Sequence, residues 1–238
     1  MQLKAEGLSK RYFRKTGEAN FFEAVKRVDF SLRPGRVTLL MGRSGSGKTT
    51  LLHMMAGLLK PSEGRVTLGE TDLYALDDAP LSRLRNERIA VVPQARSAVE
   101  TLTVRENLLL PGLLGGGKED EAAAERWMER LGIASLADSR PKELSGGELR
   151  RMAIARAMMR SPEVLMADEP TGDLDDENTA LVLGLLREAA GNGAAVLIVS
   201  HEAEALAYAD EAFRMDAGVL TAMEGYETGG KMTGDTEP

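Results

Sequence analysis

The sequence has no cysteine, no long apolar run and no excess of basic residues. Without cysteine the chain can form no disulfide, thiol nucleophile or thiolate metal site, and a reducing compartment is compatible with this but not required by it. The net charge of −7 argues against a protein that binds nucleic acid irrespective of sequence, so we expect no nucleic-acid partner.

The apolar segments are too short to cross a membrane or to direct secretion. The N-terminal stretch MQLKAEGLSKRYFRK lacks the apolar core of a signal peptide. The run AAVLIVS at 194–200 is far below the roughly 20 residues that span a bilayer. We therefore expect a soluble chain that reaches any membrane through a partner.

Short strand-like runs alternate with helix-like patterns along most of the chain. The strand-like runs are apolar without a polar face, which is typical of a parallel sheet buried on both sides. The alternation predicts an α/β fold with a mostly parallel sheet. We expect strands at 36–41, 164–168 and 194–200, and helices at 49–59, 179–190 and 202–208.

The remaining segments differ in character from this core. Between about 95 and 160 the pattern is mostly helical, which predicts a helical subdomain. Residues 1–35 and 65–73 are predicted to form short strands of a small, separate β part. We predict a single domain over 1–222, followed by a flexible tail at 223–238, because that segment is polar and rich in glycine.

The segment GRSGSGKT at 42–49 fits the pattern G-x-x-x-x-G-K-[ST] between a predicted strand and a predicted helix, the context in which this pattern binds nucleotide phosphates. Its glycines allow backbone N–H groups to point at phosphate oxygens, and the following helix adds its positive end. Lys48 is expected to reach the β- and γ-phosphates of ATP, and the Thr49 hydroxyl to bind Mg²⁺. The nucleotide-binding residues predicted here are Gly42, Arg43, Ser44, Gly45, Ser46, Gly47, Lys48, Thr49 and Thr50.

Two carboxylates stand at the end of the predicted strand in VLMADE at 164–169. Asp168 is placed to hold Mg²⁺, and Glu169 to polarise the attacking water. An Asp-Glu pair at a strand end is more often a solvated turn, so its meaning depends on the phosphate motif. His201 follows the next strand and is predicted to contact the γ-phosphate, although a histidine in such a place is more often incidental.

The segment LSGGE at 144–148 precedes the basic, helix-forming stretch LRRMAIARAMMR. Considered alone, Ser145 is explained as a helix N-cap, with glycines in the adjoining turn. Together with GRSGSGKT and VLMADEP, however, LSGGE resembles the signature motif of ABC ATPases, and the resemblance covers about residues 3–220. It implies a P-loop NTPase core with a small antiparallel β part and a helical subdomain.

The resemblance also implies that two chains assemble head to tail. In ABC ATPases the signature serine and glycines cap the γ-phosphate held by the other subunit, which assigns Ser145, Gly146 and Gly147 to a nucleotide bound in trans. The glycines permit close backbone approach, and the helix after them aims its positive end at the phosphate. A single chain is then expected to be nearly inactive.

Further positions match the family's motifs one by one. Tyr12 in LSKRY matches the aromatic residue that stacks on adenine, and Gln94 in VVPQ matches the Q-loop glutamine. Asp175 in GDLD belongs to the matched D-loop, and His201 matches the switch histidine. The resemblance thus implies a catalytic set of Glu169, His201, Lys48 and Gln94, and metal ligands Thr49, Gln94 and Asp168.

The segment ADEPTGDLD at 167–175 narrows the resemblance to the ATPases of lipoprotein release, macrolide export, bacitracin-type peptide resistance and cell division. The segment ARSAVETLT after Gln94 departs from the lipoprotein-release pattern, because it lacks the aromatic and leucine residues common there. In the family this segment contacts the membrane partner, so the cargo stays open.

The resulting interpretation is an ATP-hydrolysing motor subunit of a bacterial ABC transporter. Its implied partners are a second ATPase subunit, expected to be an identical chain, and an integral-membrane permease that holds the dimer at the cytoplasmic face of the cell membrane. The expected cargo is lipid-linked, peptide or drug-like, moved by export or extraction. The alternative is a cell-division-type ATPase that regulates a periplasmic enzyme through its membrane partner without moving cargo.

Overall fold

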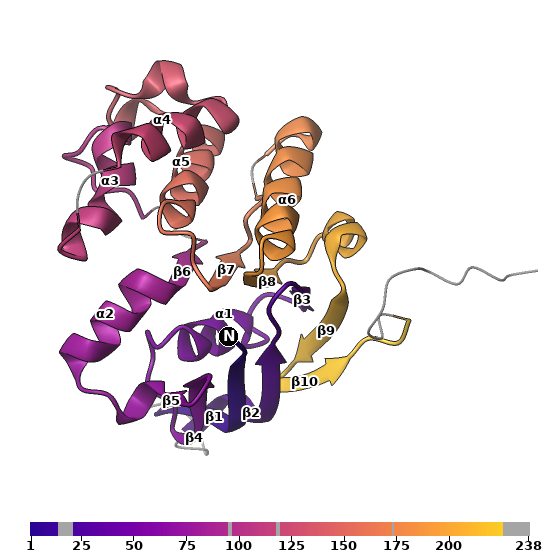
Figure 1. Cartoon of the computed structure of the whole chain (residues 1–238). Helices are drawn as coiled ribbons and strands as arrows, with labels where there is room; N and C mark the ends of the chain where they lie inside the picture. The colour runs from indigo at the N-terminus through magenta and orange to yellow at the C-terminus, as the bar shows by residue number, and fades with distance from the viewer. Residues whose placement is uncertain (14–20, 95–96, 118–119, 173, 226–238) are drawn as a thin grey trace, which may run out of the picture.

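Two sheets with helices packed around them make up the fold (Figure 1). The computed structural model describes residues 1–13, 21–94, 97–117, 120–172 and 174–225. Most of the predicted C-terminal tail and Asp173 of the matched D-loop lie outside these residues.

The larger sheet has six strands in the order β10-β9-β3-β8-β7-β6. All neighbouring pairs from β9 to β6 are parallel, and β10 pairs antiparallel with β9 at the edge. The strands are β3 (Val37–Met41), β6 (Ile89–Val92), β7 (Val164–Asp168), β8 (Ala195–Val199), β9 (Glu211–Asp216) and β10 (Val219–Ala222). Three of them match the runs predicted from the sequence, and the α/β prediction is confirmed.

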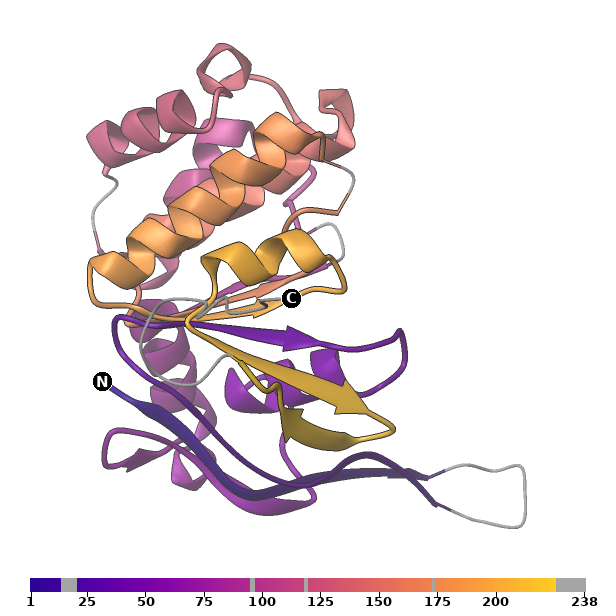
Figure 2. The same cartoon turned by 90° about the vertical axis from the view of Figure 1, so that its right-hand side faces the viewer.

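The smaller sheet is antiparallel, in the order β2-β1-β4-β5. It consists of β1 (Leu3–Phe13), β2 (Phe21–Leu32), β4 (Glu63–Leu68) and β5 (Thr71–Asp72). We expected short strands in this part of the chain, whereas β1 and β2 have 11 and 12 residues and lie side by side in Figure 2. The register of β1 shifts between Ala5 and Leu8, where Gly7 has φ 59°, and this bulge breaks the alternation that indicates one long strand.

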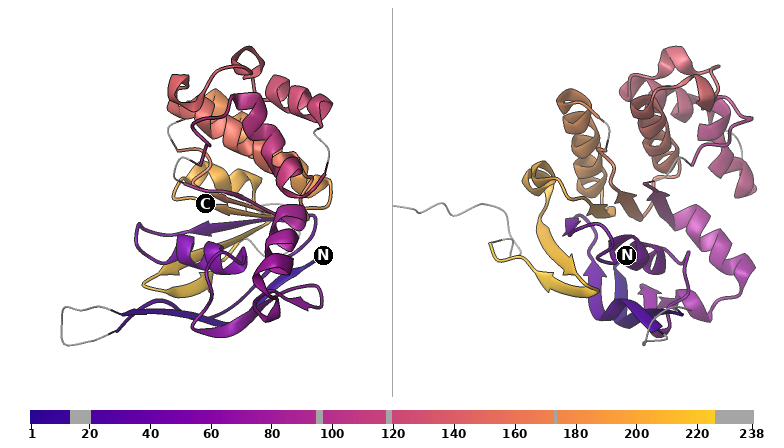
Figure 3. Two further views of the ribbon diagram at one scale, coloured as in Figure 1. Left: turned by 90° about the vertical axis from the view of Figure 1, so that its left-hand side faces the viewer. Right: turned by 180° about the vertical axis from the view of Figure 1, so that it is seen from behind.

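Helices cover the large sheet on both faces. Helix α1 (Lys48–Met55) shares a core with the antiparallel sheet on one face, whereas α6 (Asp176–Gly191) and a group of helices pack on the other (Figure 3). Successive residues of β8 show this division, since Val196 and Ile198 belong to the second core and Leu197 to the first. A strand buried on both faces therefore reads as a continuous apolar run.

The group of helices lies between about 95 and 160, where a helical subdomain was expected. It contains α3 (Val104–Leu114), α4 (Glu121–Arg130), α5 (Gly146–Met158) and the 3₁₀ turns η2 (Ala134–Leu136) and η3 (Pro141–Glu143). The chain passes from β5 of the smaller sheet to β6 of the larger sheet through η1 (Leu73–Ala75) and α2 (Asp78–Arg88). None of the helices in the described part of the chain combines the length and apolar character that a bilayer span requires.

Several helix boundaries differ from the sequence expectation for local reasons. The helix expected at 49–59 ends at Met55, because Gly57 adopts φ 71° and the N–H groups of Gly57 and Leu58 turn back to Met54 and His53. The segment 202–208 forms a 3₁₀ helix, η4 (Ala203–Tyr208), rather than an α-helix. α6 begins earlier than expected, because the side chain of Asp175 accepts a hydrogen bond from the Asn178 N–H and caps it.

One fully buried amide holds the segment that leads into α3. The Oδ1 of Asn107 accepts a hydrogen bond from the Val99 N–H at 2.9 Å. Its Nδ2 is directed at the carbonyl oxygens of Val99, Leu102 and Thr103 at 3.1, 3.2 and 2.9 Å. Asn107 therefore replaces the backbone pairing that an irregular segment cannot make by itself.

We expect Asn107→Ala to lower the free energy of unfolding by about 2–4 kcal/mol, because it leaves a cavity and removes the partner of several backbone groups. Leu114→Ala at the end of the same helix, where Leu114 is 74% exposed, is the matched control and should change it by less than about 0.5 kcal/mol. Urea unfolding measures both. Equal midpoints for the two variants would show that the amide is not needed for stability.

Candidate active site

The connection between β3 and α1 is a tight loop of glycines with left-handed backbones. Gly42, Gly45 and Gly47 have φ angles of 152°, 75° and 110°. A Cβ at Gly47 would lie 2.2 Å from the carbonyl oxygen of Ala24, and one at Gly42 2.3 Å from that of Met215. Glycine is thus required by both conformation and space. No side chain caps α1 at Gly47, so the helix presents its N-terminus to this loop.

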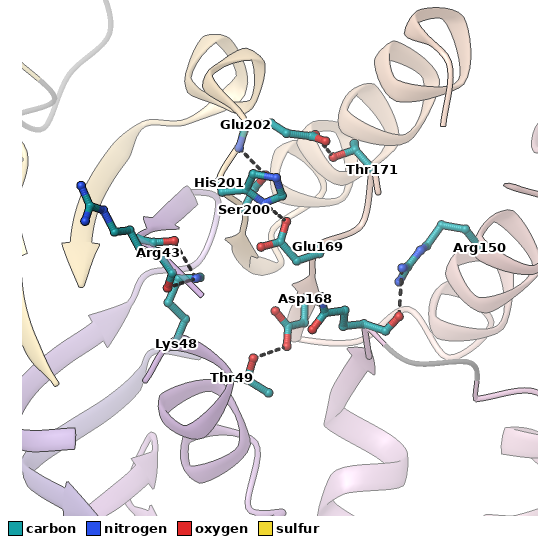
Figure 4. Close-up of polar contacts among 12 residues, drawn as sticks. Arg43, Lys48, Thr49, Arg150, Asp168, Glu169, Thr171, Ser200, His201 and Glu202 are labelled. Atoms are coloured by element: carbon teal, nitrogen blue, oxygen red, sulfur yellow. Dashed lines mark hydrogen bonds and ion pairs between the residues drawn. The ribbon is translucent and has the colours of Figure 1, made fainter. Parts of the chain in front are cut away.

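The ammonium group of Lys48 folds over the same loop. Its Nζ donates to the carbonyl oxygens of Gly42 and Arg43 at 2.7 and 3.0 Å (Figure 4). Lys48 is only 7% exposed, so its charge is held inside the curve of the loop rather than in bulk solvent. This arrangement places a cation and backbone N–H groups around one point, which is suited to binding a phosphate.

Thr49 and Asp168 bring two oxygen ligands together from different elements. The Thr49 hydroxyl at the start of α1 donates to Oδ2 of Asp168 at the end of β7, at 2.7 Å. Burial raises the pKa of the Asp168 carboxyl, and the hydrogen bond from Thr49 opposes that shift. Within the described residues no cluster of three or more histidine, cysteine or acidic side chains could hold a metal ion. A hydroxyl and a carboxylate fit Mg²⁺, which takes few protein ligands and completes its shell with phosphates and water.

Glu169 and His201 meet because β7 and β8 are parallel neighbours. Asp168 pairs with Val199, so the residues that follow the two strands emerge side by side. Nδ1 of His201 lies 2.9 Å from Oε2 of Glu169, and the Glu169 N–H donates to the Val199 carbonyl at 2.8 Å. Glu169 has φ 50°, a left-handed conformation that is uncommon for a residue other than glycine. The carboxylate is therefore fixed at a sharp turn, with an imidazole beside it.

These groups line one cavity of about 700 Å³. Most of the site residues predicted from the sequence contribute to it within a single chain. Tyr12, at the far end of β1, and Gln94, after β6, complete its wall. The sequence analysis did not identify Phe22 and Ala24, which also line it. Phe22 stands opposite Tyr12 in the β1–β2 pairing, a relation that becomes visible only once the strand register is known. The lining residues are Tyr12, Phe22, Ala24, Gly42, Arg43, Ser44, Gly45, Ser46, Gly47, Lys48, Thr49, Thr50, Gln94, Asp168, Glu169 and His201.

Ser145, Gly146, Gly147 and Asp175 do not line this cavity. Ser145 caps α5: its hydroxyl accepts from the Glu148 N–H at 3.3 Å, and the Ser145 N–H donates to the Glu148 carboxylate at 2.7 Å. The carboxylate of Glu148 accepts from the Ser145 N–H and, at 2.8 Å, from the Ser145 hydroxyl, and these two bonds lower the pKa of Glu148. The N-cap explanation of Ser145 is thereby confirmed, and a contact with a nucleotide on another chain stays a prediction.

Three arginines of α5 tie it to the segment that follows β6 and to helix α6. Arg150 donates to the carbonyl oxygens of Pro93 and Gln94 at 2.8 and 3.0 Å. Arg156 donates to the Ser97 carbonyl at 2.8 Å and to its hydroxyl at 2.6 Å. Arg151 donates to the side chain of Asn178, which in turn bonds the Asp175 carboxylate. The helix that Ser145 begins is therefore linked directly to Gln94, on the cavity wall, and through Asn178 to Asp175.

Comparisons with known proteins give the same picture. A family model described as ABC transporter matches residues 25–172. The chain is 37% identical over 204 residues to the lipoprotein-releasing system ATP-binding protein LolD of Shewanella sp. strain MR-4, covering 84% of this chain and 88% of that one. LolD of Saccharophagus degradans is 34% identical over 201 residues, covering 83% and 88%.

Two solved structures resemble the fold closely. The dimeric structure of MJ0796, a bacterial ABC transporter cassette, superposes with a TM-score of 0.85 at 29% identity, covering 94% of this chain and 99% of that chain. A dimeric post-hydrolysis state of the same cassette, bound to ADP and Pi, gives the same values.

We expect Gly47→Ala to destabilise the chain more than Gly45→Ala, because both glycines have positive φ but only a Cβ at Gly47 would strike backbone. Gly45→Ala has nothing within 4 Å of its new Cβ and should cost only the conformational penalty, about 1–2 kcal/mol. Thermal melting of the two variants measures the difference. Similar melting temperatures would mean that the loop accommodates a Cβ at Gly47 without additional loss of stability.

Proposed function

Because the chain belongs to the ABC transporter family of ATP-binding proteins, and is thereby an ABC-type ATPase, we propose that it powers a membrane transport complex as a dimer of identical subunits. One observation carries the proposal. The glycine loop, the Thr49–Asp168 pair and the Glu169–His201 pair all face one cavity of about 700 Å³.

Binding of ATP uses groups that are already in position. Lys48 exchanges its carbonyl contacts for the β- and γ-phosphates, while the N–H groups of the glycine loop cradle the same oxygens. Thr49 and Asp168 hold Mg²⁺, with Gln94 as a further ligand. When bound, the metal would offset the negative charge that develops on the phosphate oxygens. Tyr12, which lines the same cavity, is proposed to stack on the adenine.

Hydrolysis uses the Glu169–His201 pair. Glu169 accepts a proton from the attacking water, whose oxygen forms a bond to the γ-phosphorus while the bond to the ADP oxygen breaks. His201 lies 2.9 Å from the carboxylate and is exposed toward the cavity, so it can fix the carboxylate's orientation and contact the γ-phosphate. The turn at Glu169, with its left-handed backbone, limits the orientations available to the base.

A second chain is proposed to complete the site. Ser145, Gly146, Gly147 and Asp175 lie outside the cavity of their own chain, at the N-termini of α5 and α6. A helix N-terminus with glycines is suited to receive a phosphate from outside. The similar cassette MJ0796 is described as dimeric, which supports an assembly in which these residues face the partner's ATP.

The transport partner is proposed to be an integral-membrane permease that holds the dimer at the cytoplasmic face of the membrane. Relatives named for lipoprotein release support a lipid-linked cargo. Part of the segment proposed to contact the permease, Ala95 and Arg96, lies outside the described residues. Purification from membranes with the attached permease identified by mass tests this proposal, and recovery of the dimer alone would count against it.

We expect Glu169→Gln to bind ATP but to lose hydrolysis by about 10²–10⁴-fold, because the amide retains the shape of the side chain and cannot accept the proton. Glu129→Gln, an exposed carboxylate on α4, is the matched control for loss of one charge and should hydrolyse ATP normally. Phosphate release and the mass of the ATP-bound dimer are measured for both. Near-normal turnover of Glu169→Gln would remove Glu169 from its proposed role.

Mixing Ser145→Arg with Lys48→Ala tests the shared site. Each variant alone is expected to be inactive, because every site of either homodimer carries one lesion. In a mixed dimer one site carries both lesions and the other neither, so about half of the dimers formed at equal mixing should contain one intact site. Recovery of ATPase activity on mixing supports the shared site. Mixed dimers shown by mass to form, yet without activity, would contradict independent sites built from two chains.

A further inference from the structure

A second contact joins the two loops that carry Glu169 and His201. The hydroxyl of Thr171 donates a hydrogen bond to Oε2 of Glu202 (Figure 4). Thr171 lies two residues after Glu169, and Glu202 comes directly after His201. The loops that follow β7 and β8 are thus connected twice, once by the Glu169–His201 pair and once by this contact, which we call the Thr171–Glu202 bridge.

The Thr171–Glu202 bridge is the more buried of the two connections. Thr171 is 2% exposed, whereas the side chain of His201 is 67% exposed. The Glu202 N–H donates to the hydroxyl of Ser200 at 3.0 Å, and Ser200 is itself fully buried. The bridge on one side of the histidine and the buried Ser200 on the other therefore hold the His201 loop to the interior.

The bridge also braces the turn at Glu169. The Gly172 N–H donates to the Glu169 carbonyl at 3.3 Å, and the Leu174 N–H to the Thr171 carbonyl at 3.1 Å, so backbone hydrogen bonds hold the residues on both sides of Thr171. A left-handed backbone at a residue such as Glu169 persists only where the surroundings fix it. The Thr171 side chain supplies such a constraint from the neighbouring loop.

We propose that Thr171 and Glu202 are positioning residues, whose hydrogen bond sets the separation and orientation of the Glu169 carboxylate and the His201 ring. This inference rests on the roles of Glu169 and His201 in the proposed function. Neither Thr171 nor Glu202 lines the cavity, so the bridge acts through those two side chains and not on ATP. A displacement of about 1 Å in a catalytic group costs up to about 10²-fold in rate, so a small relaxation of the loops is measurable.

The experiment compares steady-state ATPase kinetics of the full chain with and without the bridge. Thr171→Val removes the hydroxyl at nearly constant volume and should lower kcat about 10-fold while KM for ATP changes less than about twofold, because ATP contacts are intact. Thr171→Ser keeps the hydroxyl and should restore kcat. A merely structural role would lower the melting temperature of Thr171→Val without this division between kcat and KM.

Changes at Glu202 provide a second arm if Thr171→Val folds poorly. Glu202→Met should reproduce the loss of kcat, and Glu202→Gln, which retains an acceptor oxygen, should recover most of it. Glu204→Met is the matched control, since Glu204 is exposed on η4, the 3₁₀ helix that directly follows Glu202, and its change should leave kcat unchanged. The double variant Thr171→Val with Glu202→Met should lose no more than the worse single variant, because both remove one contact.

Wild-type kcat in Thr171→Val and Glu202→Met would overturn the positioning role, as would fully additive losses in the double variant. Glu169→Gln, measured beside them, separates the two proposals. An inactive Glu169→Gln together with active bridge variants rejects the bridge alone, whereas an active Glu169→Gln rejects the proposed function itself.

Discussion

Parallel pairing of β7 with β8, and of β8 with β3, is the constraint on which the site depends. Val199 pairs with both Asp168 and Leu40, so the carboxyl ends of three strands lie in one row. Every residue that follows these ends is delivered to the same edge of the sheet, although the segments are far apart in sequence. The hydrogen bonds of the ladder thus bring together the glycine loop, the acidic pair and the histidine before any side chain contributes.

The parts of the fold and of the site that depend on adjacent residues could be predicted from the sequence. The glycine loop and the strand that ends at Asp168 were predictable, because turn geometry and apolar runs depend on adjacent residues. The lengths of β1 and β2 were not, since a bulge at Gly7 interrupts the alternation. Phe22 and the Thr171–Glu202 bridge were missed for a related reason. Phe22 is placed opposite Tyr12 by the register of β1 against β2. Thr171 and Glu202 are 31 positions apart, a separation that no short sequence pattern spans.

Helix α5 connects two residues, Ser145 and Gln94, that the proposed mechanism assigns to two different bound nucleotides. Its first residue follows Ser145, and Arg150 holds the backbone at Gln94. The helix is continuous over 13 residues, so we expect a shift at its N-terminus to reach the carbonyl groups bound by Arg150 and Arg156. These hydrogen bonds connect α5 directly to the site of its own chain, while its N-terminus faces the proposed neighbouring site.

The pairing of Thr49 with Asp168 bears on the order in which molecules arrive. A hydroxyl and one carboxylate, already bonded to each other at 2.7 Å, form too small a ligand set to capture a strongly hydrated divalent ion from solution. In the proposed mechanism phosphate oxygens supply the remaining attraction, so Mg²⁺ would arrive already bound to ATP. Free magnesium in the cell would then act on this chain only through the fraction of ATP that carries the ion.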